Sequence, residues 1–364
     1  SLQKDGILFK MRRTQDLPDK ESATMFFQDC KLSHQAQITG ISHSVKEIFP
    51  PDLLDLTQLQ KEANIRYGYT ASEVYDIAQS LYEKNLISYP RTSSRYLTED
   101  VFDSLSPIMA RLLSWELFPA AKGTGGIDIS NLSRHVISAE KANVHHAIII
   151  TGIRPGNMSE KEMQVYRLVA GRMLEAFMAP CRIETTNVEA VCAAQHFKAE
   201  QTRIIEAGWH DVFMHSDMVP KSGYSVNELP EVEKGDNLNI CGCNMVHKKE
   251  LPVDPFTDAE LVEYMELNGL GTVSSRTNII RTLVNRKYIR YSGKYIVPTP
   301  KGMFTYETIR GKKIADTSLT ADWEKQLTGL ESGMITGQDF LNRIRTLAKE
   351  MTDDIFNTYS TKEE

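Results

Sequence analysis

Hydrophobic and polar positions change their period several times along the chain, and each change predicts a different kind of element. Residues 6–11 and 35–42 are extended-looking runs with turn-like residues 18–20 between them, so residues 1–50 predict strands. Pro50 and Pro51 mark the change to helix, because a residue before proline avoids the helical region.

Two helices are expected next. The first covers residues 56–67, and the second opens at Thr70 with Glu73 three positions later, a capping box in which each side chain satisfies a free backbone amide. Apolar residues then recur at helical spacing as one buried stripe: Val74, Ile77, Ala78 and Leu81. The helix should end near Asn85, immediately before a segment rich in arginine and hydroxyl groups.

The following region, residues 99–178, is predicted to be mainly helical with a glycine-rich loop at 123–126. Strand-like alternation then returns at 185–194, 196–200 and 237–241. Because this second β region resembles the first, we infer that residues 1–52 and 178–252 form one β domain, with a helical domain of residues 53–177 inserted into it.

The last third, residues 253–364, begins with another capping box at Thr257 and Glu260. Its first helix stops at residues 268–269, a second is expected over 274–286, and residues 288–297 predict a hairpin. Helix, glycine turn, helix and hairpin follow one another in the order of a winged helix.

Charge adds a candidate surface to this last region. The net charge is −6, so nucleic-acid binding would need local basic patches. No acidic residue occurs between Gly269 and Lys301, whereas seven basic residues do: Arg276, Arg281, Arg286, Lys287, Arg290, Lys294 and Lys301. This distribution predicts a phosphate-binding surface, and its alternative is an ordinary solvated basic helix.

Cysteine usage and hydropathy suggest the compartment. The five cysteines are scattered, which is typical of reduced thiols in the cytosol. Residues 241–243 with His247 allow a zinc interpretation, although no second Cys/His pair lies at finger spacing. No signal peptide and no run of about 20 apolar residues is present, so we expect a cytoplasmic protein without a membrane partner.

The candidate chemistry lies in residues 87–97, which read ISYPRTSSRYL. A tyrosine, with a pKa near ~10, becomes a useful nucleophile only where its phenolate is stabilised. Arg91 and Arg95 supply permanent positive charge that forks onto phosphate oxygens, so the segment suits attack by Tyr89 on a phosphodiester. The alternative is a buried tyrosine with two solvated arginines.

Residues 86–97 resemble the segment around the active-site tyrosine of type IA DNA topoisomerases, the topoisomerase III branch in particular. The similarity continues at residues 50–64, at 145–149 (HHAII) and at 269–276 (GLGTVSSR), in the same order. Together these motifs cover most of the chain from about residue 48 to its end.

This resemblance implies that Tyr89 is the nucleophile, Arg91 its phosphate partner and His145 a group that approaches the scissile phosphate. The predicted DNA-binding residues are Arg95, Thr92, Ser94, His146, Thr272, Ser274, Ser275, Arg276 and Arg286. The chain departs from the family pattern at Ser93, where aspartate is usual, and at Ile150 and Val273, where proline is frequent. The loss of the aspartate would weaken contacts with a toprim domain or alter religation.

The fold class implied is a multidomain α+β protein with the toroidal type IA architecture. It comprises a β arch (gate) domain of residues 1–52 and 178–252, a helical tyrosine-bearing domain of residues 53–177, and a winged-helix-like domain of residues 253–364. The toprim domain of the same polypeptide, which carries Mg²⁺, is not found in this sequence. We therefore expect a fragment without its own metal, inactive alone.

The reaction implied is cleavage and religation of mainly single-stranded DNA through a 5′-phosphotyrosine link with strand passage, in a cytoplasmic, nucleoid-associated enzyme. Two alternatives stay open. One is a winged-helix transcription regulator in which Tyr89 is structural, and the other is a DNA scaffold that has lost catalysis. A regulator would prefer a duplex site, whereas a topoisomerase fragment would prefer single strands.

Overall fold

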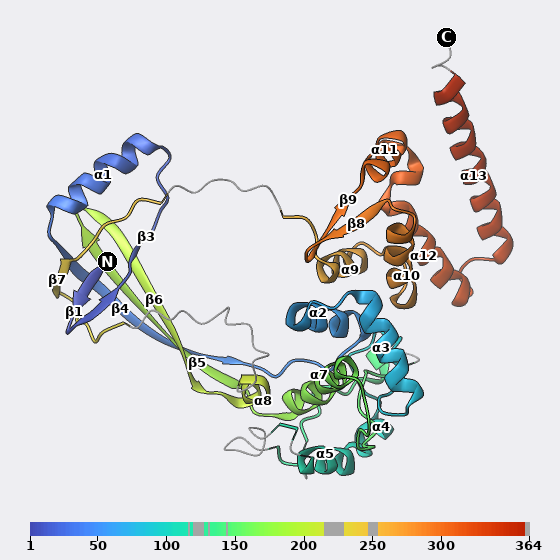
Figure 1. Cartoon of the computed structure of the whole chain (residues 1–364), viewed down its shortest axis with the longest axis horizontal. Helices are drawn as coiled ribbons and strands as arrows, with labels where there is room; N and C mark the ends of the chain where they lie inside the picture. The colour runs from blue at the N-terminus through green and yellow to red at the C-terminus, as the bar shows by residue number, and fades with distance from the viewer. Residues whose placement is uncertain are drawn as a thin grey trace. The chain divides into compact units, whose positions relative to one another are not determined.

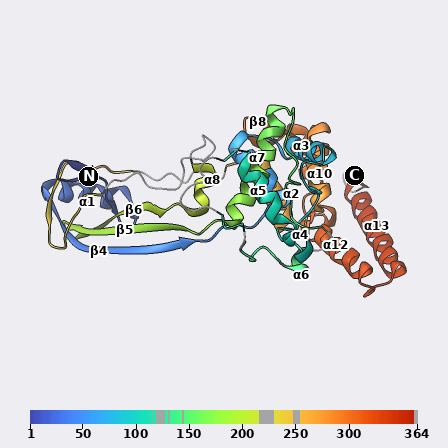
Figure 2. The same cartoon turned by 90° about the horizontal axis from the view of Figure 1, so that it is seen from below.

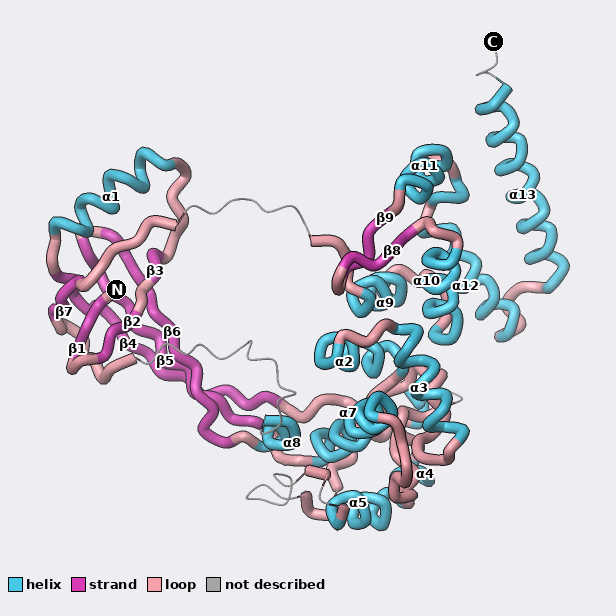
Figure 3. The backbone as a smooth tube through the Cα atoms, viewed as in Figure 1, coloured by secondary structure: helices cyan, strands magenta, loops and turns pink. Residues whose placement is uncertain are grey.

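The computed structural model describes residues 1–115, 117–118, 127–129, 132–142, 145–214, 229–246 and 254–360. The chain divides into two compact units. The sheet unit comprises Ser1–Pro51, Phe118–Asp128 and Leu174–Pro252, and the helical unit comprises Asp52–Leu117, Ile129–Met173 and Val253–Glu364. Strands predominate in the first and helices in the second (Figure 3).

The sheet unit is built on a seven-stranded antiparallel sheet among the described residues, in the order β2-β1-β7-β4-β5-β6-β3. Its strands are β1 (Leu2–Lys4), β2 (Ile7–Phe9), β3 (Arg12–Arg13), β4 (Gln35–Ile48), β5 (Cys181–Cys192), β6 (Gln195–Glu206) and β7 (Asn237–Ile240). Figure 2 shows β4, β5 and β6 running side by side as a long ribbon. Strands from the two ends of this unit's sequence thus share one sheet.

Helix α1 (Lys20–Leu32) packs on this sheet, and its Cys30 joins a core that contains Phe9, Ile38 and Val188. Asp19 begins the helix, because its carboxylate accepts a hydrogen bond from the Ser22 N–H at 2.7 Å. The prediction of strands throughout residues 1–50 is therefore wrong for residues 20–32. Asp19 acts as a helix N-cap there and not as a turn residue. Two short elements, the 3₁₀ turn Gly208–His210 and α8 (Asp211–Met214), follow β6.

The helical unit begins with α2 (Leu56–Tyr67) and α3 (Ala71–Glu83), shown in Figure 1. The predicted bounds of α2 and the capping box between Thr70 and Glu73 are both confirmed. Shorter helices follow, α4 (Glu99–Asp103), α5 (Leu105–Ser114) and α6 (Ala139–Ala142), and then the longer α7 (Glu160–Phe177), whose last turn belongs to the sheet unit.

The C-terminal part of the helical unit has the predicted order of helix, turn, helix and hairpin. It consists of α9 (Asp258–Leu267), α10 (Val273–Asn285), β8 (Ile289–Ser292), β9 (Tyr295–Pro298), α11 (Pro300–Ile309), the 3₁₀ turn Lys313–Ala315, α12 (Thr317–Glu331) and α13 (Gly337–Ser360). Its winged-helix assignment stays a prediction, as do the boundaries of the three expected domains.

Helices α9 and α10 pack against α2 and α3 through a small apolar core that includes Ala71, Val262, Met265 and Ile280. The buried Asp258 carboxylate accepts hydrogen bonds from the Ala71 N–H and, at 2.9 Å, from the Tyr291 hydroxyl. Burial raises the pKa of Asp258, although both hydrogen bonds oppose that rise. One carboxylate therefore joins the start of α3 to both α9 and the hairpin.

Glu162 fastens α7 to α3 in a similar way. Its carboxylate accepts hydrogen bonds from the Ser80 hydroxyl at 2.7 Å and the Ser159 N–H at 3.0 Å, and it pairs with Lys84. The contact with Lys84, followed by those with Ser80 and Ser159, lowers the pKa of Glu162 to about 2. The side chain is only 13% exposed, so these contacts are poorly screened by solvent.

We predict that Glu162→Gln lowers the free energy of unfolding at pH 7 by roughly 1–3 kcal/mol. Because the pKa of Glu162 is depressed in the folded chain, its ionised form stabilises the fold above about pH 4.5 and progressively less as pH falls toward 2. The stability gap between wild type and variant should therefore narrow at pH 3. Urea unfolding at pH 7 and pH 3 measures this difference, and Glu331→Gln, at an exposed position, is the control. An equal difference at both pH values would contradict the stabilising role of the ionised Glu162.

Candidate active site

Residues 86–97, the catalytic segment, are held in place by residues 145–151. The Ser88 N–H donates to the Ile149 carbonyl at 2.8 Å, and the Ser88 hydroxyl in turn accepts from the Ile149 N–H at 3.0 Å. Further along, the Ala147 N–H donates to the Tyr96 carbonyl at 2.9 Å. Since Pro90 between them is buried, the backbone that carries the candidate nucleophile has a well-defined course.

Tyr89 is half-buried between two rings. Its ring centroid lies 5.5 Å from that of Tyr82 in an edge-on arrangement and 4.6 Å from that of His145. Its hydroxyl makes no hydrogen bond to any described residue. No described residue therefore engages the phenol oxygen, which is what a nucleophile requires, and the exposed imidazole of His145 lies next to the ring.

Arg91 lies along α3. Its guanidinium carbon is 5.1 Å from the centre of the Tyr75 ring, and its Nη2 donates to Gln79 Oε1 at 3.2 Å. The buried Nε has no hydrogen-bond partner among the described residues. The guanidinium is therefore held against α3, and its permanent charge suits an anion such as a phosphate.

Thr92 and Ser94, in contrast, are buried and bonded to backbone. The Thr92 hydroxyl donates to the His145 carbonyl at 3.0 Å, and the Ser94 hydroxyl donates to the Lys141 carbonyl at 2.8 Å. These bonds connect the catalytic segment to Lys141 and His145. Ser93 between them is exposed. The predicted DNA contacts of Thr92 and Ser94 remain predictions, and their observed contacts support the loop.

Arg95 and His146 also have partners. Arg95 Nε donates at 2.8 Å to Asp55, whose other carboxylate oxygen caps α2 by accepting from the Gln58 N–H at 2.7 Å. His146 Nδ1 lies 2.7 Å from the Ala147 carbonyl oxygen. The Arg95 side chain nevertheless remains 37% exposed, which leaves part of its guanidinium available to a ligand.

The second set of predicted residues lies at the start of α10. The Thr272 N–H donates to the Ser275 hydroxyl at 2.8 Å, and Ser274 is half-buried beside them. Gly271 has a φ of +70°, and a Cβ there would lie 2.8 Å from Ser275 Oγ, so only glycine fits this turn without strain.

The two arginines of this set differ sharply. Arg276 is buried, pairs with Glu266 at 3.3 Å and lies 3.5 Å from the Thr57 hydroxyl of α2. Arg286, at the end of α10, is exposed, and its guanidinium has no partner in the part of the chain that the structure describes. Arg276 therefore joins α10 to α2, whereas Arg286 is free to meet a ligand.

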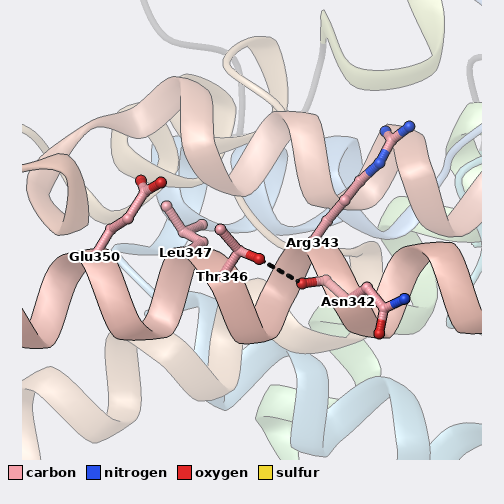
Figure 4. A pocket seen from close by; sticks show the side chains of 5 residues that line it. All are labelled: Asn342, Arg343, Thr346, Leu347 and Glu350. Atoms are coloured by element: carbon pink, nitrogen blue, oxygen red, sulfur yellow. Dashed lines mark hydrogen bonds between the residues drawn. The ribbon is translucent and has the colours of Figure 1, made fainter.

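A shallow hollow on α13 lies apart from all these residues in the sequence. Figure 4 shows its five lining side chains along that helix: Asn342, Arg343, Thr346, Leu347 and Glu350. The Thr346 hydroxyl donates to the Asn342 carbonyl at 3.0 Å, which is ordinary helix geometry. None of the predicted site residues lines this hollow.

Some contacts of the site escaped the sequence analysis. Tyr75, Gln79 and Tyr82 on α3 touch Tyr89 or Arg91, and Asp55 pairs with Arg95. The three α3 side chains are four and three residues apart, so they lie on one face of the helix. This spacing is the one indication of their common role that the sequence contains. What could not be foreseen is that this face meets the catalytic segment.

A comparison with solved structures identifies the fold. A solved structure of full-length topoisomerase I from Thermotoga maritima superposes with a TM-score of 0.72 at 22% identity, covering 96% of this chain and 57% of that one. The fold is therefore that of a topoisomerase. Residues 2–342 also match the family model described as DNA topoisomerase. The chain belongs to this family, as a type IA protein of the topoisomerase III kind.

Curated relatives agree. The chain is 30% identical to the DNA topoisomerase 3 of Bacillus licheniformis over 344 residues, 88% of this chain and 47% of the relative. It is 30% identical to the Shouchella clausii protein of the same name over 383 residues, 97% of this chain and 51% of the relative. The chain thus spans about half the length of these relatives.

Arg276 and Arg286 form a matched pair for experiment. Arg276→Ala leaves Glu266 partly buried without its cation, so it should lower the free energy of unfolding by roughly 2–4 kcal/mol. Arg286→Ala should change stability by less than about 0.5 kcal/mol but weaken binding of a single-stranded oligonucleotide by about 1 kcal/mol and reduce the salt slope. Urea unfolding and fluorescence anisotropy at several salt concentrations measure both. The reverse pattern would contradict the assignment.

Proposed function

We propose that this chain carries the strand-cleaving tyrosine of a type IA topoisomerase and acts in changing DNA topology through a 5′-phosphotyrosine intermediate. Membership in the family supports DNA topology change as the general activity. The observation that supports Tyr89 as the nucleophile is its position: its hydroxyl has no partner among the described residues, and its ring lies between Tyr82 and His145, two residues from Arg91.

In the proposed reaction the Tyr89 oxygen forms a bond to phosphorus, and the bond from phosphorus to the 3′ oxygen breaks. The phenol loses its proton, and the leaving 3′ oxygen gains one. Because one phosphoester bond replaces another, the step is balanced and can be reversed. Arg91 neutralises charge on the non-bridging oxygens through its permanently charged guanidinium, which Tyr75 and Gln79 hold in place. His145, exposed beside the phenol, donates to a phosphoryl oxygen.

Single-stranded DNA is the proposed substrate, and residues 269–301 are proposed to hold its backbone. Arg286, Lys287, Arg290, Lys294 and Lys301 are all exposed there. The start of α10 adds free amides and the positive end of a helix dipole. A winged-helix arrangement of α9, α10 and the β8–β9 hairpin is part of this proposal, as is a cytoplasmic, nucleoid-associated location.

A toprim domain with Mg²⁺ is proposed as the partner of this chain in catalysis. The metal would supply electrostatic assistance to the leaving 3′ oxygen. No group of three or more His, Cys, Asp or Glu that could hold a metal occurs among the described residues, and His247 of the zinc interpretation lies outside them. No described helix is long and apolar enough to cross a membrane.

Tyr89→Phe should abolish covalent capture of a labelled single-stranded oligonucleotide when the toprim domain is supplied. The substitution removes only the phenol oxygen, so binding of the oligonucleotide should stay nearly unchanged. Tyr96→Phe is the matched control, because the Tyr96 hydroxyl is already engaged by Lys141 Nζ at 3.4 Å. Denaturing gels that resolve the protein–DNA adduct measure the outcome. Adduct in Tyr89→Phe but not in Tyr96→Phe would reassign the nucleophile.

The chain alone should neither cleave nor relax DNA. Without the toprim domain the leaving 3′ oxygen lacks its proposed assistance, although the nucleophile remains. Relaxation of supercoiled plasmid in the presence of Mg²⁺ measures this, with the toprim-bearing form as the positive control. Relaxation by the chain alone would refute the proposed division of labour, whereas preference for a duplex site with no adduct in either form would favour the regulator.

A further inference from the structure

One face of α3 contacts the catalytic segment at three positions. Tyr75, Gln79 and Tyr82 are four and three residues apart, so the 3.6-residue repeat places them on one side of the helix. Tyr75 and Gln79 touch Arg91, and Tyr82 touches Tyr89. The two proposed catalytic side chains, which flank the buried Pro90, are therefore both supported by a single helix.

Tyr82 restrains the ring of the nucleophile. Its ring meets that of Tyr89 at an interplanar angle of 77°, the edge-on geometry that aromatic pairs favour. The His145 ring is a second neighbour at 4.6 Å, so rotation of the Tyr89 ring is restricted by two contacts. The Tyr82 hydroxyl makes no hydrogen bond to a described residue, which means that the ring and not the hydroxyl provides the support.

Tyr75 does the same for Arg91. Its ring lies under the guanidinium at 5.1 Å, a cation–π contact, and its hydroxyl likewise has no described partner. Gln79 Oε1 accepts from Arg91, while Gln79 Nε2 donates to Glu83 at 2.8 Å, which orients the amide with its oxygen toward the arginine. Arg91 is thus held by Tyr75 and Gln79, and within the described part of the chain its Nε has no partner.

We propose that Tyr82 and Tyr75 are positioning residues, Tyr82 for the nucleophile Tyr89 and Tyr75 for Arg91. This inference rests on the proposed function and adds the residues that set its geometry. Each acts through the face or edge of its ring and does not itself contact the phosphate. Because small displacements of a reacting group slow a reaction far more than they weaken binding, the rate of cleavage is the sensitive quantity.

The test uses the toprim-bearing form and two measurements. The first is the single-turnover rate of adduct formation at saturating single-stranded oligonucleotide, and the second is the Kd of the same oligonucleotide measured without Mg²⁺. Tyr82→Leu and Tyr75→Leu should lower the rate about 10- to 100-fold and change Kd less than about twofold. Tyr82→Phe and Tyr75→Phe, which keep the rings, should restore the rate to within about twofold of wild type.

A double-mutant comparison separates positioning from a general structural role. Tyr75→Leu should cause no further loss of rate in an Arg91→Ala background, because its effect passes through the arginine. Tyr82→Leu should keep its full effect in that background, because its effect passes through Tyr89. Tyr306→Leu, at an exposed tyrosine on α11 (48% exposed, against 38% for Tyr82), is the control and should leave both rate and Kd unchanged.

The outcomes are distinct. If wild type forms no adduct, the proposed function itself fails. If wild type forms adduct but the leucine variants react at its rate, the inference fails. If Kd rises by the same factor as the rate falls, the rings bind DNA bases and positioning is refuted. Should a leucine variant lose cooperative melting, the methionine variant at that position, which fits irregular space, is measured in its place.

Discussion

The hydrogen bonds between residues 86–97 and residues 145–151 are the constraint on which the candidate site depends. They bring together two segments that are more than fifty residues apart in the sequence, as the bond from Thr92 to the His145 carbonyl shows. Without these hydrogen bonds, nothing would hold the Tyr89 and His145 rings next to each other. The hydroxyls of Thr92, Ser94 and Ser88 bond to backbone groups and so support the course of the loop.

Positive charge is divided between two tasks. Arg276 and Arg281 are paired with Glu266 and Asp76, and these pairs join α10 to the helices beside it. Arg286 and Lys287 lie exposed at the end of the same helix. Although the chain is acidic overall, it keeps exposed basic groups at the end of α10, because other arginines are engaged in ion pairs within the helical unit.

Local signals predicted much of the fold. The bounds of α2, the capping boxes at Thr70 and Thr257, and the β8–β9 hairpin depend on neighbouring residues, which the sequence displays directly. Helix α1 was missed because Asp19 after Pro18 fits both a turn and an N-cap. Partners from distant parts of the sequence were harder to predict. Nothing near Arg276 in the sequence indicates that its side chain will contact Thr57 and Glu266.

The same distinction explains the site. Tyr89, Arg91 and His145 were identified through motifs, whereas Tyr75, Gln79 and Tyr82 were not, because their role arises only when α3 meets the catalytic segment. Helix α3 ends at Glu83, with Asn85 at a φ of +56° just after it, and the following segment brings Tyr89 and Arg91 back into contact with the same helix. A helix followed closely by such a turn can therefore support the side chains of the segment that follows it, and the packing of α3 against α2 and α9 gives that support its stiffness.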